Sequence, residues 1–285
     1  MSLLLSHRKL GIDTTLRVDV PEWEALAEGL HSSARIARER CPPDTPADLA
    51  WPRPAGGQWQ ILLHGAPWHG AVQSRDDLFL QSDSLLDDLI RERLQEFPQL
   101  HAGAVMDPAG RVAVICGSSG AGKTSLVTAC VLRGWRWLSD EHLCFRHPDP
   151  LAVEGFRRNF NLKERSFATF PETAALPGTR ELVRPGDGQR VRFFNAEELP
   201  GGKFVPQGKV HLLILPEYVA TATPPVSTRI AGAAFVARLV PELHRGDARV
   251  IAWLAEVARS VPVFNLQYAD PRAAAASLDP LMIPL

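Results

Sequence analysis

The stretch at residues 117–124 reads Gly-Ser-Ser-Gly-Ala-Gly-Lys-Thr and fits the pattern G-x-x-x-x-G-K-[ST] at every position. An apolar run at 111–116 precedes it and predicts a buried strand. Residues 124–133 after it predict a helix, and Gly134 stands where a helix-ending glycine belongs. A glycine-rich turn that matches by chance would lack these flanks. Strand, loop and helix in this order favour an α/β fold with an anion-binding loop.

The residue types of this loop suit a nucleoside triphosphate. Glycines let backbone N–H groups turn inward around phosphate oxygens. Lys123 supplies a mobile cation for the β- and γ-phosphates, and Thr124 offers a hydroxyl to Mg²⁺. The following helix N-terminus also favours an anion, because its dipole and unpaired N–H groups point toward the loop.

Two acidic residues, Asp140 and Glu141, end the next predicted strand at 135–139, and Asp140 follows Lys123 by 17 positions. Phosphoryl transfer needs a carboxylate for Mg²⁺ and, where a hydroxyl attacks, a second one to orient it or accept its proton. The strand end therefore predicts a reaction site, although either residue could be a surface charge.

His101 and a group of basic residues are further candidates. His101 opens an apolar run at 101–106 that a Pro-Gly turn joins to 111–116, which predicts a hairpin. Its imidazole could bond a carboxylate or phosphate, or it could be a structural histidine. Arg158 and Lys163 lie in a predicted loop, where they could neutralise phosphate or simply face solvent.

Composition sets limits on partners and location. The net charge of −1 gives no general attraction to nucleic acid or to an anionic membrane, and no run reaches the roughly 20 apolar residues that span a bilayer. The N-terminal charges follow the apolar residues, the reverse of a secretory signal. Four widely spaced cysteines, without a C-x-x-C pair, predict buried free thiols and a cytoplasmic location.

The chain predicts two parts. Residues 1–82 hold an alternating strand at 15–20, a helical stretch at 21–30 and a strand at 58–64, which together predict a small α+β module. An amphipathic helix at 84–97 opens the second part, which is expected to span 83–285.

Three segments together resemble a known family. His101-Ala-Gly-Ala-Val, the loop at 117–124, and Arg133-Gly-Trp-Arg-Trp-Leu-Ser-Asp-Glu141 are similar to the catalytic domain of the HPr kinase/phosphorylase superfamily. The chain looks closest to HPr-kinase-related kinases, including those that modify lasso peptide precursors. Arg158-Asn-Phe-Asn-Leu-Lys163 resembles an R-P-x-x-L-K stretch of these kinases. The resemblance implies a P-loop kinase core of the HPr kinase/PEP carboxykinase type, with a mixed sheet.

The resemblance also implies roles for residues. Asp140 would be the general base, Lys123 and His101 would assist catalysis, and Arg158 and Lys163 would contact phosphate or acceptor. Thr124 and Glu141 would hold Mg²⁺, with Glu141 replacing the family's second aspartate. ATP would bind through Gly117, Ser118, Ser119, Gly120, Ala121, Gly122, Lys123, Thr124 and Ser125. The longer signature by which true HPr kinases hold their protein substrate is not found.

Three functions follow from these residues. The first is an ATP-dependent kinase that phosphorylates a hydroxyl, expected to be a serine of a peptide or protein. The second is a small-molecule kinase on the same core. The third is a nucleotide-binding regulatory protein without transfer activity. The sequence leaves a homo-oligomer open.

Overall fold

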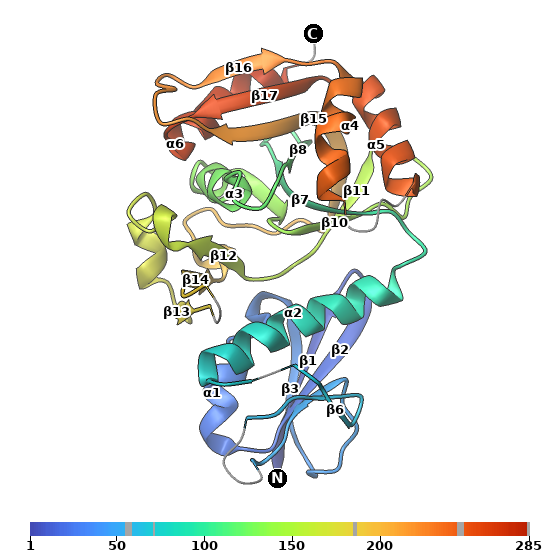
Figure 1. Cartoon of the computed structure of the whole chain (residues 1–285), viewed down its shortest axis with the longest axis vertical. Coiled ribbons are helices and arrows are strands. Elements are labelled where there is room, and N and C mark those ends of the chain that lie inside the picture. Colours follow the sequence, from blue (N-terminus) through green and yellow to red (C-terminus); the bar gives the residue numbers. More distant parts are fainter. Residues whose placement is uncertain (55–58, 71, 185–186, 244–247, 284–285) are drawn as a thin grey trace. The chain divides into compact units, whose positions relative to one another are not determined.

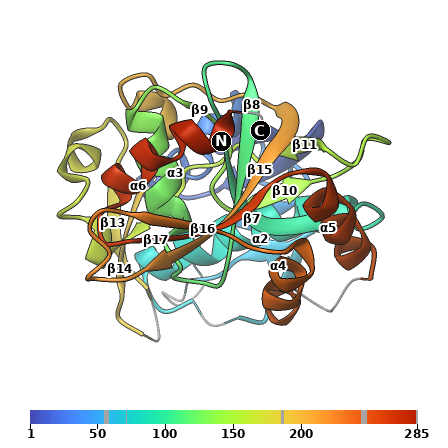
Figure 2. The ribbon, with the colours of Figure 1, turned by 90° about the horizontal axis from the view of Figure 1, so that it is seen from above.

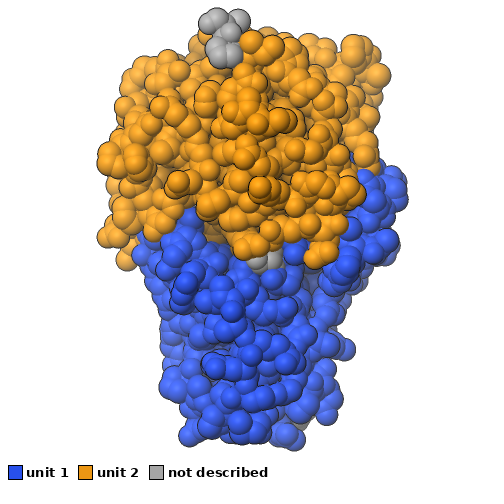
Figure 3. All heavy atoms as spheres, turned by 180° about the vertical axis from the view of Figure 1, so that it is seen from behind, with its two compact units in different colours: residues 1–94, 158–195 blue, residues 95–157, 196–285 orange. Residues whose placement is uncertain are grey.

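A computed structural model describes residues 1–54, 59–70, 72–184, 187–243 and 248–283. The chain divides into two compact units, coloured in Figure 3. Unit 1 consists of Met1–Leu94 and Arg158–Asn195, and unit 2 of Gln95–Arg157 and Ala196–Leu285.

Unit 1 is built on a six-stranded sheet in the order β3-β1-β2-β4-β5-β6 (Figure 1). In β2, buried Thr14, Leu16 and Val18 alternate with more exposed residues, the pattern of a strand with one face in a core, whereas β1 is buried over most of its length. The strands are β1 (Ser2–Lys9), β2 (Ile12–Val18), β3 (Arg35–Cys41), β4 (Leu49–Trp51), β5 (Leu62–Leu63) and β6 (Ala66–Pro67). The strand expected at 58–64 is thus confined to β5, and Gln58 lies outside the described residues.

Helices and a second sheet complete unit 1. The helical stretch expected at 21–30 is shorter, comprising the turn η1 (Pro21–Trp23) and α1 (Glu24–Ala27). A three-stranded sheet in the order β12-β14-β13 comes from the second segment of the unit, and its residues join the same core as β1 and β2. The remaining elements are η2 (Ser32–Ala34), β12 (Phe160–Lys163), η3 (Glu164–Ser166), η4 (Pro171–Ala175), β13 (Arg180–Val183) and β14 (Arg190–Phe194).

Helix α2 (Arg75–Arg93) is longer than the sequence predicts. Ser74 caps it by accepting a hydrogen bond from the backbone N–H of Asp77 at 3.1 Å, so it begins nine residues before the expected start at residue 84. Buried polar residues in the first half of the helix, among them Asp77 and Asp83, interrupt its apolar stripe, so the sequence pattern there does not predict a helix. The boundary expected between residues 82 and 83 consequently falls inside this helix, whereas unit 1 ends its first segment at Leu94.

Unit 2 is built on a mixed sheet in the order β11-β10-β7-β8-β15-β17-β16, with β9 also paired to β7. Strands β8, β15 and β17 run parallel, while β7 and β8 form the expected antiparallel hairpin. The strands are β7 (Gln99–Met106), β8 (Arg111–Cys116), β9 (Arg136–Ser139), β10 (His142–Cys144), β11 (Ala152–Gly155), β15 (Gln207–Tyr218), β16 (Val226–Arg229) and β17 (Val263–Tyr268). A mixed α/β architecture is therefore confirmed.

Helices lie on both sides of this sheet. Helix α3 (Lys123–Leu132) packs against α6 (Pro271–Ser277), and α4 (Gly232–Leu239) packs against α5 (Ala248–Ser260). Figure 2 shows the first pair on one side of β17 and the second pair on the other. The short turns are η5 (Ala196–Glu198), η6 (Val240–Glu242) and η8 (Asp279–Met282). The strand at 135–139 and the helix at 124–133 appear as β9 and α3, within one residue at each end.

The four cysteines are buried and free, as expected. Burial raises the pKa of the Cys116 and Cys144 thiols to about 12, so both stay protonated at neutral pH. Among the described helices, none combines the length and apolar character that crossing a membrane requires.

Candidate functional site

The glycine-rich loop, residues 117–122, connects the carboxyl end of β8 to the first residue of α3 in unit 2. Strand β8 is buried because its apolar residues face helices on both sides of the sheet. Since β8, β15 and β17 are parallel, their carboxyl ends share one edge of the sheet. In open α/β sheets this edge is where ligands bind.

Gly122 is the N-cap of α3 and has a φ of 100°. A Cβ added there would lie 2.2 Å from the phenol oxygen of Tyr268, so both the backbone conformation and the packing require glycine. Gly120 also has a positive φ, 87°. The glycines of the pattern therefore serve the turn that leads the chain from β8 into the helix.

Lys123 places its ammonium group back over the loop. Its Nζ donates hydrogen bonds to the carbonyl oxygens of Gly117 at 2.7 Å and Ser118 at 3.1 Å. The residue is only 6% exposed. The positive charge is thus held at the entrance of α3, beside backbone N–H groups that favour an anion.

Asp140 lies beside Thr124, the residue expected to bind Mg²⁺. The hydroxyl Oγ1 of Thr124 is 3.5 Å from Oδ2 of Asp140, and Asp140 is 1% exposed. Because Gly103 has no side chain, β7 can lie close to α3 and to Asp140. A Cβ at Gly103 would lie 2.7 Å from Cγ2 of Val127 and 3.8 Å from Cα of Asp140. The structure therefore brings together the hydroxyl and the carboxylate that the sequence predicts for the reaction.

Because the chain turns at Ser139, the side chains of Asp140 and Glu141 reach different partners. The Ser139 hydroxyl oxygen accepts hydrogen bonds from the backbone N–H of Glu141 at 3.1 Å and of His142 at 2.9 Å. This turn ends β9 and starts β10. Asp140 contacts Thr124, while Oε1 of Glu141 lies 3.2 Å from Nδ1 of His101. The two carboxylates consequently contact different partners, Thr124 and His101.

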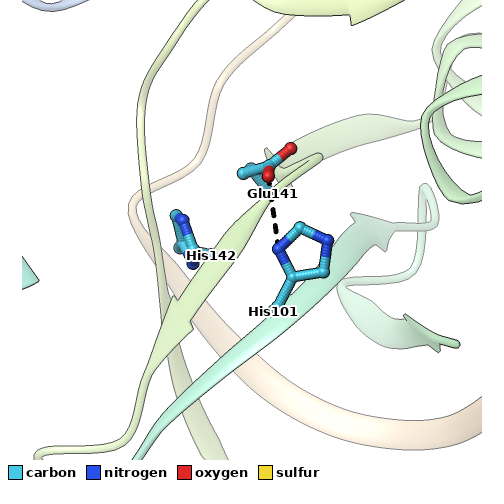
Figure 4. A group of neighbouring side chains, drawn as sticks. All are labelled: His101, Glu141 and His142. Atoms are coloured by element: carbon cyan, nitrogen blue, oxygen red, sulfur yellow. Dashed lines mark ion pairs between the residues drawn. The ribbon is translucent and has the colours of Figure 1, made fainter. Parts of the chain in front are cut away.

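His101, Glu141 and His142 form a small cluster where β7 pairs with β10 (Figure 4). His101 on β7 and His142 on β10 are register partners, and their rings stand 5.5 Å apart at 72°. One ligand atom from each of the three residues lies within 4.8 Å of the others. Two imidazole nitrogens and a carboxylate oxygen are a donor set that suits a divalent cation.

The sequence gives only a weak signal for His142 as a site residue and none for Tyr268. His142 follows the acidic pair directly, but only the pairing of β10 with β7 shows that it stands opposite His101. Tyr268 lies far along the sequence from the loop, and its phenol oxygen is 3.3 Å from the carbonyl oxygen of Gly122. No local pattern in the sequence indicates this contact.

Arg158 and Lys163 belong to unit 1, whereas the loop belongs to unit 2. The guanidinium of Arg158 pairs with Asp83 at 2.5 Å and with Asp87 at 2.7 Å, and its side chain is 8% exposed. Lys163 ends β12 opposite Val191. Contact of either residue with phosphate or acceptor stays a prediction.

Comparison with known proteins gives little beyond this geometry. No family model matches the chain, and no curated protein matches it. Among solved structures, the HPr(Ser) kinase/phosphatase from Coxiella burnetii is similar over 64% of this chain and 87% of that chain, with 14% sequence identity and a TM-score of 0.33. At this TM-score the similarity establishes neither a shared core nor an activity.

Proposed function

We propose that unit 2 is an ATP- and Mg²⁺-dependent kinase that transfers the γ-phosphate to a hydroxyl group. The observation that carries the proposal is the contact between the hydroxyl of Thr124 and the buried carboxylate of Asp140, 3.5 Å apart at the end of the glycine-rich loop. Kinase chemistry needs a cation-binding hydroxyl and a carboxylate within one small volume. A simple anion-binding turn would not need the carboxylate.

Each residue at the loop then has a role. The backbone N–H groups of residues 117–125 and the ammonium of Lys123 neutralise the phosphates. Thr124 would hold Mg²⁺, which supplies further neutralisation of the phosphate charge. Asp140 accepts the proton of the acceptor hydroxyl, while the oxygen of that hydroxyl forms a bond to the γ-phosphorus. The bond from that phosphorus to the β–γ bridging oxygen breaks, and ADP leaves.

Glu141 was expected to hold Mg²⁺ together with Thr124, and we propose instead that it binds a cation together with two histidines. His101 and His142 provide imidazole nitrogens within 4.8 Å of the Glu141 carboxylate. These three residues would hold a divalent cation beside the site of transfer. His101 also orients the Glu141 carboxylate through their contact at 3.2 Å.

A serine of a peptide or protein is the acceptor class we favour. This choice rests on the sequence resemblance carried by residues 101–105, 117–124 and 133–141. Transfer to a peptide would be detected by mass spectrometry as a phosphate on serine, after reactions with separate pools of peptides and metabolites. Phosphate found only on metabolites would contradict the choice of a peptide.

The role of Asp140 is tested with Asp140→Asn. The amide cannot accept the proton, so transfer should fall about 10²- to 10⁴-fold while MgATP binding changes only a few-fold. Asp279→Asn is the control, because Asp279 is an exposed carboxylate of the same unit, 52% exposed and paired with Arg133. Full transfer by Asp140→Asn would refute the role of general base.

A further inference from the structure

Tyr268 is a buried tyrosine at the start of α3, outside the residues that the proposed reaction uses. It is the last residue of β17 and is 2% exposed. Its phenol hydroxyl donates a hydrogen bond to the carbonyl oxygen of Gly122 at 3.3 Å. Residues from two distant parts of the chain therefore meet at the peptide that leads into the helix.

The carbonyl that Tyr268 contacts is also the first acceptor of helix α3. The backbone N–H of Leu126 donates to the same Gly122 oxygen at 2.9 Å. Hydrogen bonds to a carbonyl polarise its peptide group, which makes the N–H on the other side a stronger donor. That N–H belongs to Lys123, one of the residues expected to face phosphate.

The elements on both sides of Tyr268 fix its position. Strand β17 pairs in parallel with β15, which places Tyr268 opposite Tyr218. Immediately after it, the side chain of Asp270 caps helix α6, and α6 packs against α3. Tyr268 therefore connects the end of strand β17 to the N-terminus of α3, and its side chain is buried there.

We propose that Tyr268 is a positioning residue for the nucleotide. It holds the Gly122–Lys123 peptide in the orientation that binds phosphate, and it polarises the N–H of Lys123 toward the phosphate oxygens. The inference rests on the proposed function, because it assigns a residue to the same phosphate site. Tyr268 acts through Gly122 and touches no reacting atom.

The chain offers a matched control. It contains only two tyrosines, and Tyr218 is 61% exposed although it is the register partner of Tyr268. Tyr268→Phe keeps the ring and its packing and removes only the hydroxyl, and Tyr218→Phe makes the same change at a surface position. MgADP affinity is measured by calorimetry and the unfolding midpoint by thermal denaturation, for both variants and the wild-type chain.

Loss of one hydrogen bond from the loop should weaken MgADP binding about threefold to tenfold in Tyr268→Phe. The unfolding midpoint should stay within a few degrees of the wild-type value, and Tyr218→Phe should match the wild-type chain in both respects. A residue that only supported the fold would lower the midpoint and leave the affinity unchanged. Wild-type affinity in Tyr268→Phe would overturn the inference.

Fluorine NMR gives a second, independent test. Protein labelled with 3-fluorotyrosine should show two resonances, which Tyr218→Phe assigns. MgADP should shift the Tyr268 resonance and leave that of Tyr218 in place. If nucleotide binds but the Tyr268 resonance does not move, the inference fails and the proposed function stands. If the wild-type chain binds no nucleotide by calorimetry, the proposed function fails and the inference fails with it.

Discussion

The two units each contain a cluster of histidine and carboxylate side chains, and the two clusters differ in what balances their charge. In unit 1 the cluster is His31, Asp83 and Asp87, and in unit 2 it is His101, Glu141 and His142. The first is buried throughout, whereas the side chains of His101 and Glu141 are 27% and 29% exposed. Burial raises the cost of any unbalanced charge, so the two clusters face different requirements.

The unit 1 cluster contains its own cations, and together with them we name it the ionic core. Nζ of Lys9 lies 2.5 Å from Asp87, and Arg158 pairs with both Asp83 and Asp87. Nε2 of His31 lies 2.9 Å from Asp83. Burial acts to raise the pKa of Asp83, but attraction to Arg158 and the hydrogen bond from His31 outweigh it and hold this pKa below its usual value. Two carboxylates and two cations balance, which suits a structural role.

The unit 2 cluster includes His101, whose neighbour Ala102 pairs with Cys116, the residue before the glycine-rich loop. Its carboxylate contacts a histidine at 3.2 Å, and the next residue, Asp140, contacts Thr124. Charge at this place would be balanced by a substrate and its metal ion. A buried cluster with its own cations is suited to stabilising a fold, whereas the partly exposed unit 2 cluster has room for a bound cation, as the proposed function requires. It also favours a structural role for Arg158 over contact with phosphate.

The largest effect should come from breaking the ionic core. Asp87→Asn leaves Lys9 and Arg158 with one carboxylate fewer in a buried place, which should cost about 3–5 kcal/mol of unfolding free energy. Arg158→Met should cost a similar amount. Chemical denaturation measures both changes.

Asp13→Asn is the control for this experiment. It removes a carboxylate that pairs with Arg8 at the surface of the same unit, with side chains 48% and 56% exposed. No measurable loss of stability is expected there. If Asp87→Asn were as harmless as Asp13→Asn, the structural role of the ionic core would be wrong.

Acid should weaken unit 1 through His7, which is buried next to this core. Burial, with repulsion from His31 and Lys9, lowers the pKa of His7 from 6.5 to about 3. Between these two values the unfolded chain binds a proton that the folded chain does not bind, so stability falls as the pH falls. At about 1.4 kcal/mol per pH unit, His7 alone would remove about 3 kcal/mol between pH 6.5 and pH 4.

The pH dependence is checked with His7→Asn, which removes the titrating group. Unfolding free energies measured from pH 7 to pH 4 should decline less steeply for this variant than for the wild-type chain. His69→Gln, at an exposed position of the same unit, should keep the wild-type slope. Equal slopes for wild type and His7→Asn would show that His7 is not buried in its neutral form in the folded chain.

The smallest effect on stability should come from Glu141→Gln. It is the counterpart in unit 2 of Asp87→Asn, because both changes neutralise the carboxylate of a histidine cluster. The contact of Glu141 with His101 is partly exposed, so its loss should cost less than about 1 kcal/mol of unfolding free energy. Chemical denaturation of the two variants side by side makes the comparison. A loss of several kcal/mol in Glu141→Gln would give both clusters the same structural role.

Local features were the predictable ones. The strand, loop and helix at 111–133 are contiguous, so pattern and propensity suffice to place them. The hairpin of β7 and β8 was predictable for the same reason. The contact between Thr124 and Asp140 follows from a short connection that returns β9 to the neighbourhood of the loop.

Features that depend on distant parts of the chain were not predictable. The ionic core joins Lys9 to Asp87, 78 positions away, and Arg158 to Asp83, 75 positions away. No single segment of the sequence contains all the charged residues of the ionic core. The return of Arg158–Asn195 to unit 1 could not be read from the chain either, because the segment has ordinary loop composition. The pairing of His142 with His101 needs the register of two strands.

The central claim is that the loop at 117–122 binds a nucleoside triphosphate through Lys123. Calorimetric titration of MgATP into the wild-type chain and into Lys123→Ala tests it most directly. The contacts of Lys123 Nζ at 2.7 and 3.1 Å place its charge on the loop. Micromolar binding by the wild-type chain, weakened 100-fold or more in the variant, is the predicted result. No binding by the wild-type chain, or equal binding by both, would contradict it.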